Sequence, residues 1–284
     1  MEITATQLRR RHLTLAQRGV ALAVERSVEW FSVRQRLEHL LLVATFVALA
    51  ATGVPQKFAG ADLSQWIIRQ LGGIDTARFL HRASAVAFMV LAMEHAGTLL
   101  LQAVRRRLRP TMAPSLADVL NAVQMIRYCL GLSRSHPHFG RFDYRQKFEY
   151  WGIVFGSTVM IMTGLALWFP ALVTRVLPGQ FVAAAREGHS NEALLALLVV
   201  IVWHLYSVIL SPSIFPGDLT IFTGRISERR LLEEHPLEYE RLVAEGRLRA
   251  SPRGAAAIGR RRFRLSRLSG RAAAARGSSR ARPR

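Results

Sequence analysis

The sequence predicts an all-α fold, an integral membrane four-helix bundle with both termini in the cytoplasm. Half of the 284 residues are hydrophobic although the formal net charge is +20. The apolar residues stand in long blocks that are nearly free of charge, whereas a water-soluble domain would spread them at helix or strand periods. Four blocks are long enough to cross a bilayer, and basic residues gather between some of them. We therefore expect the blocks to be solvated by lipid.

The chain opens with a basic arm, residues 1–36, which we expect in the cytoplasm. The arm contains three consecutive basic residues, Arg9, Arg10 and Arg11. It has no apolar run followed by a small-residue cleavage site, so no cleavable signal peptide is expected.

Four apolar segments are predicted to cross the membrane and to form one transmembrane domain over residues 37–210. A bilayer core about 30 Å thick requires about 20 mostly apolar residues in helical form. The segments that meet this requirement are approximately residues 37–56, 78–101, 149–169 and 190–210.

The charge of the connections predicts the orientation of these spans. The connection over residues 102–148 carries nine basic residues, with Asp118 and Asp143 as its only acids. Basic connections stay in the cytoplasm. The other two connections are nearly neutral and are expected outside, so both termini would lie on the cytoplasmic side.

The C-terminal part is predicted to be a cytoplasmic segment over residues 211–245 and a disordered tail over residues 246–284. No acidic residue follows Glu245, and thirteen arginines lie between Arg247 and Arg284. A pI near 11.6 would normally suggest nucleic-acid binding. Because much of the charge lies in a tail that is unable to build a core, attraction to anionic lipid headgroups is the better explanation. We expect membrane lipid as a partner and no nucleic acid.

The first and third spans resemble each other at a shift of 111 residues. The matching pairs are Glu38 with Glu149, Thr52-Gly53 with Thr163-Gly164, and Phe58 with Phe169. The molecule is therefore predicted to consist of two related helical hairpins. His39 falls on Tyr150 in this alignment, so the symmetry is broken at a position that could matter for a ligand.

Histidines in or beside the spans are the candidate ligands of a redox cofactor. The single cysteine, Cys129, excludes an internal disulfide, a cysteine-ligated iron–sulfur cluster and a CxxCH haem attachment. A redox cofactor must then be held by histidine. The five histidines at the spans are His39, His81, His95, His189 and His204.

The spacing of these histidines favours two haems b between neighbouring helices. His81 and His95 are 14 residues apart, which leaves them within about 40° of one helix face and separates them by roughly 21 Å. His189 and His204 are 15 residues apart, with an offset of about 60° and a rise of roughly 22 Å. The alternatives for each are an interhelical hydrogen bond or an interfacial anchor. Zinc is disfavoured because its ligands must converge on one point.

The sequence resembles the membrane cytochrome b subunit of respiratory formate dehydrogenases and its relatives in thiosulfate reductase-like and nickel-iron hydrogenase complexes. The resemblance covers about residues 30–243. The matching pieces are Glu38-His39, Thr52-Gly53, Phe79-Leu80-His81, Gln146-Lys147-Phe148-Glu149-Tyr150-Trp151, Trp203-His204-Leu205-Tyr206 and His235-Pro236-Leu237-Glu238-Tyr239. Each string is weak alone, and their common order and spacing carry the resemblance.

The resemblance implies a four-helix subunit with two haems b. The outer haem would be ligated by His81 and His189, and the inner haem by His39 and His204, beside a quinone site near the cytoplasmic face. His95 departs from the pattern, because the formate dehydrogenase subunit lacks a histidine there. Since the depth of His95 matches that of His204, either His39 or His95 could be the inner partner. We favour His39 and keep His95 as a rival ligand or a quinone-side proton group.

Further candidate residues lie beside these histidines. Arg82 could pair with a haem propionate, since guanidinium binds carboxylate well, or it could extend along the outer surface. Glu94 could serve proton transfer at the quinone, or form a salt bridge to an arginine at the same end. The quinone pocket would include Asp143, Arg145, Gln146 and Lys147, which could equally belong to a solvated loop.

The predicted function is electron transfer in the bacterial cytoplasmic (inner) membrane. An extracytoplasmic partner, an iron–sulfur or multihaem cytochrome c protein, would exchange electrons with the outer haem. Menaquinone or ubiquinone would react near the inner haem, and the residues do not choose the direction of flow. We expect no catalytic residue in this chain alone. The alternative is a haem-free membrane anchor or a small transporter that uses its histidines for packing or proton relay.

Overall fold

The computed structural model of the chain describes residues 26–212 and 214–261. The expectations for the basic arm up to residue 25 and for the tail beyond residue 261 lie outside these residues. The described residues form two compact units. The span unit comprises residues 28–115 and 144–226, and the connector unit comprises residues 26–27, 116–143 and 227–261.

Four helical stretches of the span unit are long and apolar enough to cross a membrane. They are α2 (Val33–Lys57), α4 (Ile74–Val104), α6 (Tyr144–Trp168) and the stretch Gln180–Leu210. The last stretch consists of α8 (Gln180–Leu198) and the π-helical segments η1 (Val199–His204) and η2 (Tyr206–Leu210). The four predicted spans are confirmed as helices of this length and character.

Local sequence signals set where these helices begin. Ser32 caps α2 as part of a capping box, in which the Ser32 hydroxyl accepts from the Gln35 amide and the Gln35 side chain accepts from the Ser32 amide. Such a box satisfies amides that have no partner inside the helix. Before α4, Gly73 has a φ of 98°, a conformation that residues with a β carbon rarely adopt.

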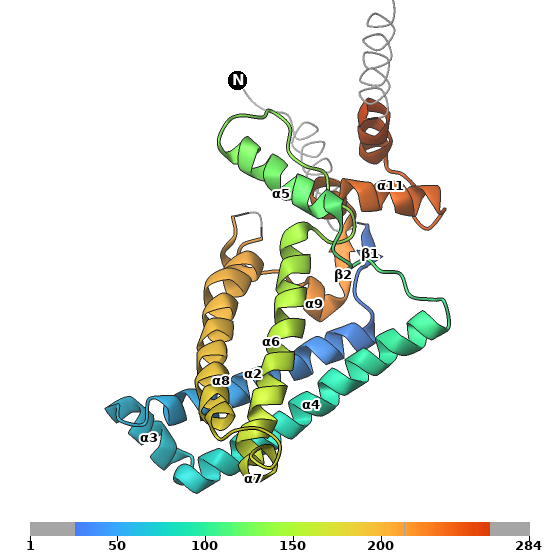
Figure 1. Cartoon of the computed structure of the whole chain (residues 1–284). Coiled ribbons are helices and arrows are strands. Elements are labelled where there is room, and N and C mark those ends of the chain that lie inside the picture. Colours follow the sequence, from blue (N-terminus) through green and yellow to red (C-terminus); the bar gives the residue numbers. More distant parts are fainter. Residues whose placement is uncertain (1–25, 213, 262–284) are drawn as a thin grey trace, which may run out of the picture. The chain divides into compact units, whose positions relative to one another are not determined.

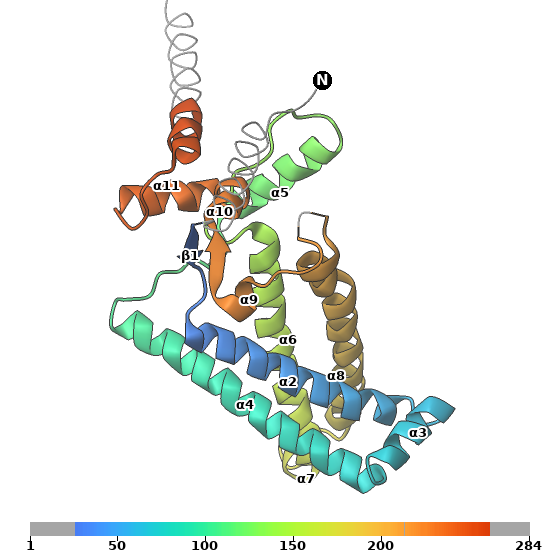
Figure 2. The same ribbon diagram turned by 180° about the vertical axis from the view of Figure 1, so that it is seen from behind.

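The spans pair as two helical hairpins, as Figures 1 and 2 show. In the first hairpin α2 packs against α4, with α3 (Asp62–Gln70) in the connection, and in the second α6 packs against α8, with α7 (Pro170–Val173) between them. Almost none of the apolar side chains of the spans is buried within the chain, which suits helices whose outer faces contact lipid.

The two hairpins are joined at one end through α2 and α8, which also contact each other. The Lys57 ammonium, in the last turn of α2, donates to Ser190 Oγ at 2.7 Å and to Asn191 Oδ1 at 2.9 Å. The predicted arrangement of two hairpins is therefore present, with a polar contact holding them together.

The connector unit contains α5 (Leu116–Cys129), α10 (Glu228–Glu234), α11 (Pro236–Ala244) and a helical segment over residues 252–261. Tyr239 is fully buried and donates its hydroxyl to Glu228 at 2.8 Å. His235 Nδ1 donates to the Gly140 carbonyl at 2.7 Å, which ties the segment before α6 to the start of α11. Strands β1 (Ser27–Glu29) and β2 (Arg225–Ser227) form a two-stranded sheet, and α9 (Thr220–Thr223) precedes β2.

Candidate functional site

Four histidines of the spans form two pairs, and both hairpins contribute to each pair. The ring centroids of His81 on α4 and His189 on α8 are 6.3 Å apart. Those of His39 on α2 and His204 on η1 are 6.2 Å apart. Two imidazoles on one metal ion have centroids roughly 6 Å apart, because each metal–nitrogen bond is about 2 Å long and each ring centre lies about 1 Å beyond the nitrogen. Both pairs thus have the separation that a shared metal ion requires.

Threonine hydroxyls orient the rings of the first pair. Thr52 Oγ1 lies 2.9 Å from His81 Nδ1, and Thr163 Oγ1 lies 3.0 Å from His189 Nδ1. Each hydroxyl donates its only proton to the carbonyl four residues earlier in its own helix, so it accepts from the imidazole. Nδ1 therefore carries the ring proton, and Nε2 keeps the lone pair with which a neutral histidine binds a metal.

Two glycines give the same rings room to approach the neighbouring helix. A β carbon at Gly53 would lie 3.0 Å from His81 Cε1, and one at Gly164 would lie 3.2 Å from His189 Cε1. Both separations are tighter than ordinary van der Waals contact, which is about 3.5–4.0 Å between carbons. The absence of a side chain is therefore what lets α2 and α6 approach these imidazoles.

The second pair is held differently. His204 Nδ1 lies 3.0 Å from Glu149 Oε2, a contact that again leaves Nε2 without a protein partner. His39 Nδ1 is buried and has no hydrogen-bond partner in the described chain. An unsatisfied buried polar atom costs about 1–3 kcal/mol. Such an atom is evidence that the ring is positioned for something other than protein packing.

His95 is engaged at both of its nitrogens. Its Nδ1 lies 3.3 Å from Glu38 Oε2, and its Nε2 lies 3.1 Å from the Tyr150 hydroxyl. The contact with Glu38 repeats, in the first hairpin, the contact between Glu149 and His204 in the second. Unlike the four paired histidines, His95 has no ring nitrogen free for a metal.

Arg82 and Glu94 lie in opposite halves of α4. The Arg82 guanidinium lies over the Trp168 ring, 5.6 Å from its centroid. The Glu94 carboxylate lies 3.2 Å from the Arg34 guanidinium. The salt bridge considered as the alternative role of Glu94 is therefore present, and the Arg82 side chain is anchored by an aromatic ring.

The four residues predicted for a quinone pocket lie at the start of α6. Asp143 is buried, with 5% of its surface exposed. Arg145 and Gln146 are exposed, and Lys147 is half-buried. Their role in quinone binding stays a prediction.

Sequence reasoning missed the residues that support the histidines. The repeat matched Thr52 with Thr163 and Glu38 with Glu149 but did not indicate the hydrogen bonds of these residues. Sequence reasoning also missed Glu192, a carboxylate about one helical turn after His189. Its Oε1 would lie 2.7 Å from a β carbon at Gly156, so that glycine makes room for a polar group inside a span.

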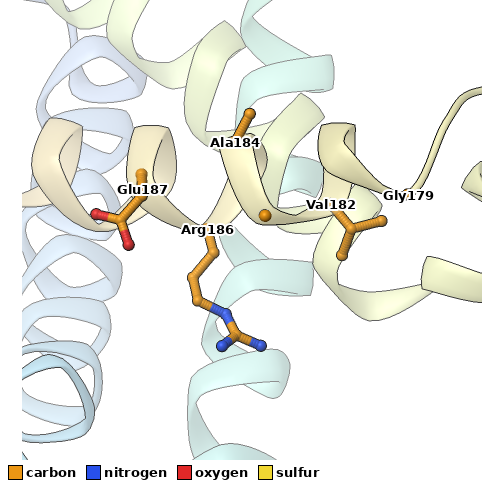
Figure 3. A pocket seen from close by; sticks show the side chains of 6 residues that line it. Gly179, Val182, Ala184, Arg186 and Glu187 are labelled. Atoms are coloured by element: carbon orange, nitrogen blue, oxygen red, sulfur yellow. The ribbon is translucent and has the colours of Figure 1, made fainter.

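A hollow beside the first turns of α8 is separate from the histidine pairs (Figure 3). Its lining residues are Gly179, Val182, Ala183, Ala184, Arg186 and Glu187. Because none of the paired histidines lines it, we assign it no role in cofactor binding.

Comparison with known proteins identifies the class of the chain. A family model described as prokaryotic cytochrome b561 matches residues 109–219, a range that contains His189 and His204. The cytochrome b556(Fdn) subunit of the nitrate-inducible formate dehydrogenase of Escherichia coli K12 is 21% identical over 204 residues, which cover 72% of this chain and 86% of the relative. The Shigella flexneri counterpart has the same identity and coverage. Both matches support a membrane cytochrome b subunit.

This class confirms the resemblance expected from the sequence. The two matches and the four apolar helices support a multi-pass bacterial membrane protein, and the matches support a role in electron transport as a subunit of an oxidoreductase. A cytochrome b carries haem b, and histidine is a common axial ligand of haem iron. The paired imidazoles, with Nε2 free in each, are the residues of this chain that fit such a group.

Proposed function

We propose that this cytochrome b subunit binds two haems b and conducts electrons between an extracytoplasmic redox subunit and the membrane quinone pool. The proposed architecture is a four-helix bundle with both termini in the cytoplasm. One observation carries the proposal: two imidazole pairs from opposite hairpins have centroid separations of 6.3 Å and 6.2 Å. A single pair would support one haem, and two pairs support a path across the membrane.

In this proposal, His81 and His189 hold the outer haem, and His39 and His204 hold the inner haem. Haem held by two histidines supplies one-electron transfer with both axial positions filled, so the chain has no substrate site at the iron. Thr52, Thr163 and Glu149 keep the ring proton on Nδ1 of His81, His189 and His204. The helices keep water away from the rings and hold the two pairs at different depths.

His39 is a better inner ligand than His95 for two reasons. His39 is the ring that lies opposite His204, and its Nε2 has no protein partner among the described residues. His95 would have to break its contact with Glu38 or Tyr150 to bind a metal. We therefore assign His95 to the protein side of the inner site.

The partner and the quinone are inferred from the relative. The relative is named as a subunit of a formate dehydrogenase, and we infer an iron–sulfur or multihaem cytochrome c partner for this chain. Menaquinone or ubiquinone would bind near the inner pair, within reach of Glu94 or of the segment from Asp143 to Lys147. Arg82 would pair with a propionate of the outer haem. Electrons could flow in either direction.

The test is the haem content of the purified subunit, measured by its reduced visible spectrum and by extraction of the haem. We expect two haems per chain, one haem in His81→Leu and in His39→Leu, and two haems in the matched control His95→Leu. A haem-free protein would support the membrane-anchor alternative. Loss of a haem in His95→Leu with none lost in His39→Leu would reverse our assignment of the inner ligand.

A further inference from the structure

Helix α5 exposes a face of large apolar residues, and its opposite face, which carries Asp118 and Asn121, packs within the connector unit. Its large apolar residues recur at intervals of three and four, which places them on one side of a helix. Each of them is between 50% and 74% exposed. We call this set the α5 stripe; it consists of Leu116, Val119, Leu120, Val123, Ile126 and Leu130.

The opposite side of α5 is the side that packs within the connector unit. Asp118, Asn121 and Met125 on that side are half-buried. Gln124, at its edge, donates to the Ser135 carbonyl at 3.2 Å and to the Ser135 hydroxyl at 3.1 Å. A helix on a water-soluble surface has the reverse arrangement, with its apolar side against the protein. The α5 stripe therefore needs a cover that the connector unit does not provide.

The position of α5 in the chain points to lipid as that cover. The helix begins eleven residues after α4 ends, a connection that spans at most roughly 40 Å when fully extended, and α6 begins fourteen residues after α5 ends. Both neighbours are membrane spans. The connection before α5 contains Arg105, Arg106, Arg107 and Arg109, and such clusters are attracted to anionic headgroups.

We propose that α5 is an interfacial helix, which lies in the plane of the membrane with the α5 stripe inserted at the boundary between headgroups and acyl chains. Helices of this kind combine a continuous apolar face with adjacent basic residues. The helix would anchor the connector unit to the surface where α4 and α6 reach the headgroups. This placement does not depend on haem binding.

The test uses the full chain in lipid nanodiscs that hold one copy each, with single cysteines labelled by an environment-sensitive fluorophore. Stripe labels are placed by Val119→Cys and Val123→Cys in a Cys129→Ser background. The matched controls are the native Cys129 and Ala117→Cys, which are also exposed on α5 but lie off the stripe. Each protein is measured in ordinary lipid and in lipid brominated in its acyl chains.

We expect bromine to quench the stripe labels by about half or more and the controls far less. Equal quenching of stripe and control labels, or no quenching of either, would overturn the proposal. A further measurement uses discs that hold several copies. Stripe labels that bromine does not quench, and that are shielded from water only in these discs, would also overturn the proposal in favour of contact between chains. Unchanged haem content in all variants verifies that the spans have folded.

Discussion

A histidine binds haem iron only with a free nitrogen, and in this subunit the neighbouring side chains decide which histidines have one. The hydroxyls of Thr52 and Thr163 accept hydrogen bonds from Nδ1 of His81 and His189. Glu149 contacts Nδ1 of His204 in the same way. The surroundings of His95 differ at one position. Tyr150 stands where the repeat places His39, and its hydroxyl forms a hydrogen bond with Nε2 of His95. A single substitution between repeats thus separates a candidate ligand from a hydrogen-bonded histidine.

At this scale we predict that Thr52→Val and Thr163→Val weaken haem binding at the outer pair. Each variant keeps the volume of the side chain and removes the acceptor of an Nδ1 proton. Loss of such a supporting contact typically lowers cofactor-metal affinity about 10–100-fold. Titration of the haem-depleted protein with haem measures the effect, and Thr52→Ser, which keeps the hydroxyl, is the control. Equal affinity in the Val and Ser variants would show that the hydroxyl has no such role.

At the scale of elements, the two hairpins use the same contacts with different helix geometry. The last span passes from α8 into the π-helical segments η1 and η2. A π-helix turns less per residue than an α-helix because its hydrogen bonds join residues five apart. The offset of about 60° expected for His189 and His204 on an ideal α-helix is therefore reduced, which brings His204 toward the face that His189 occupies.

The contact of Lys57 on α2 with α8 should stabilise the two histidine pairs, because each pair has one ring from each hairpin. Lys57→Met removes the bonds from α2 to Ser190 and Asn191 on α8. We expect the free energy of unfolding to fall by about 1 kcal/mol, seen as earlier loss of haem absorbance on heating. The control is Arg69→Met, which removes an exposed cation from the nearby α3. Equal thermal curves for both variants would mean that Lys57 does not couple the hairpins.

At the scale of the whole molecule, the first prediction concerns orientation. From the nine basic residues over 102–148 and the even number of spans, the positive-inside rule predicts that both termini lie in the cytoplasm. Alkaline phosphatase fused after Arg284 should be inactive, and the same enzyme fused after Gly60 should be active. The reverse pattern of activities would place the termini outside.

The connector unit should loosen in mild acid. Burial lowers the pKa of His235 below its ordinary value, although the hydrogen bond to the Gly140 carbonyl and the charges of Glu234 and Asp143 act in the opposite direction. The unfolded unit therefore binds a proton at a pH where the folded unit does not. Stability is then lost as the pH falls below about 6.5 toward the lowered pKa.

Hydrogen exchange of α10 and α11 at successive pH values measures this loss of stability. In His235→Asn, which keeps a donor for Gly140 and cannot titrate, the protection should change less between pH values. Identical pH profiles for the variant and the parent would assign the acid response to other groups.

Much of the fold was predictable because hydrocarbon imposes strict rules on sequence. A span must be long and apolar, so all four were identified, and the repeat of Glu38 with Glu149 revealed the two hairpins. Histidines stood out because they are costly in apolar surroundings. The ends of the helices were less predictable: Ser32 and Gly73 set them through capping and backbone conformation, which hydropathy does not report.

Composition and order along the chain were enough to predict the number of spans, the class of protein and the five candidate histidines. Which of these histidines face each other, and which ring nitrogens have no protein partner, depends on how the helices pack. The two facing pairs arise where α4 lies opposite α8 and where α2 lies opposite η1, between residues up to 165 positions apart, as for His39 and His204. No periodicity within one helix specifies such a contact, because it is set by how two hairpins pack.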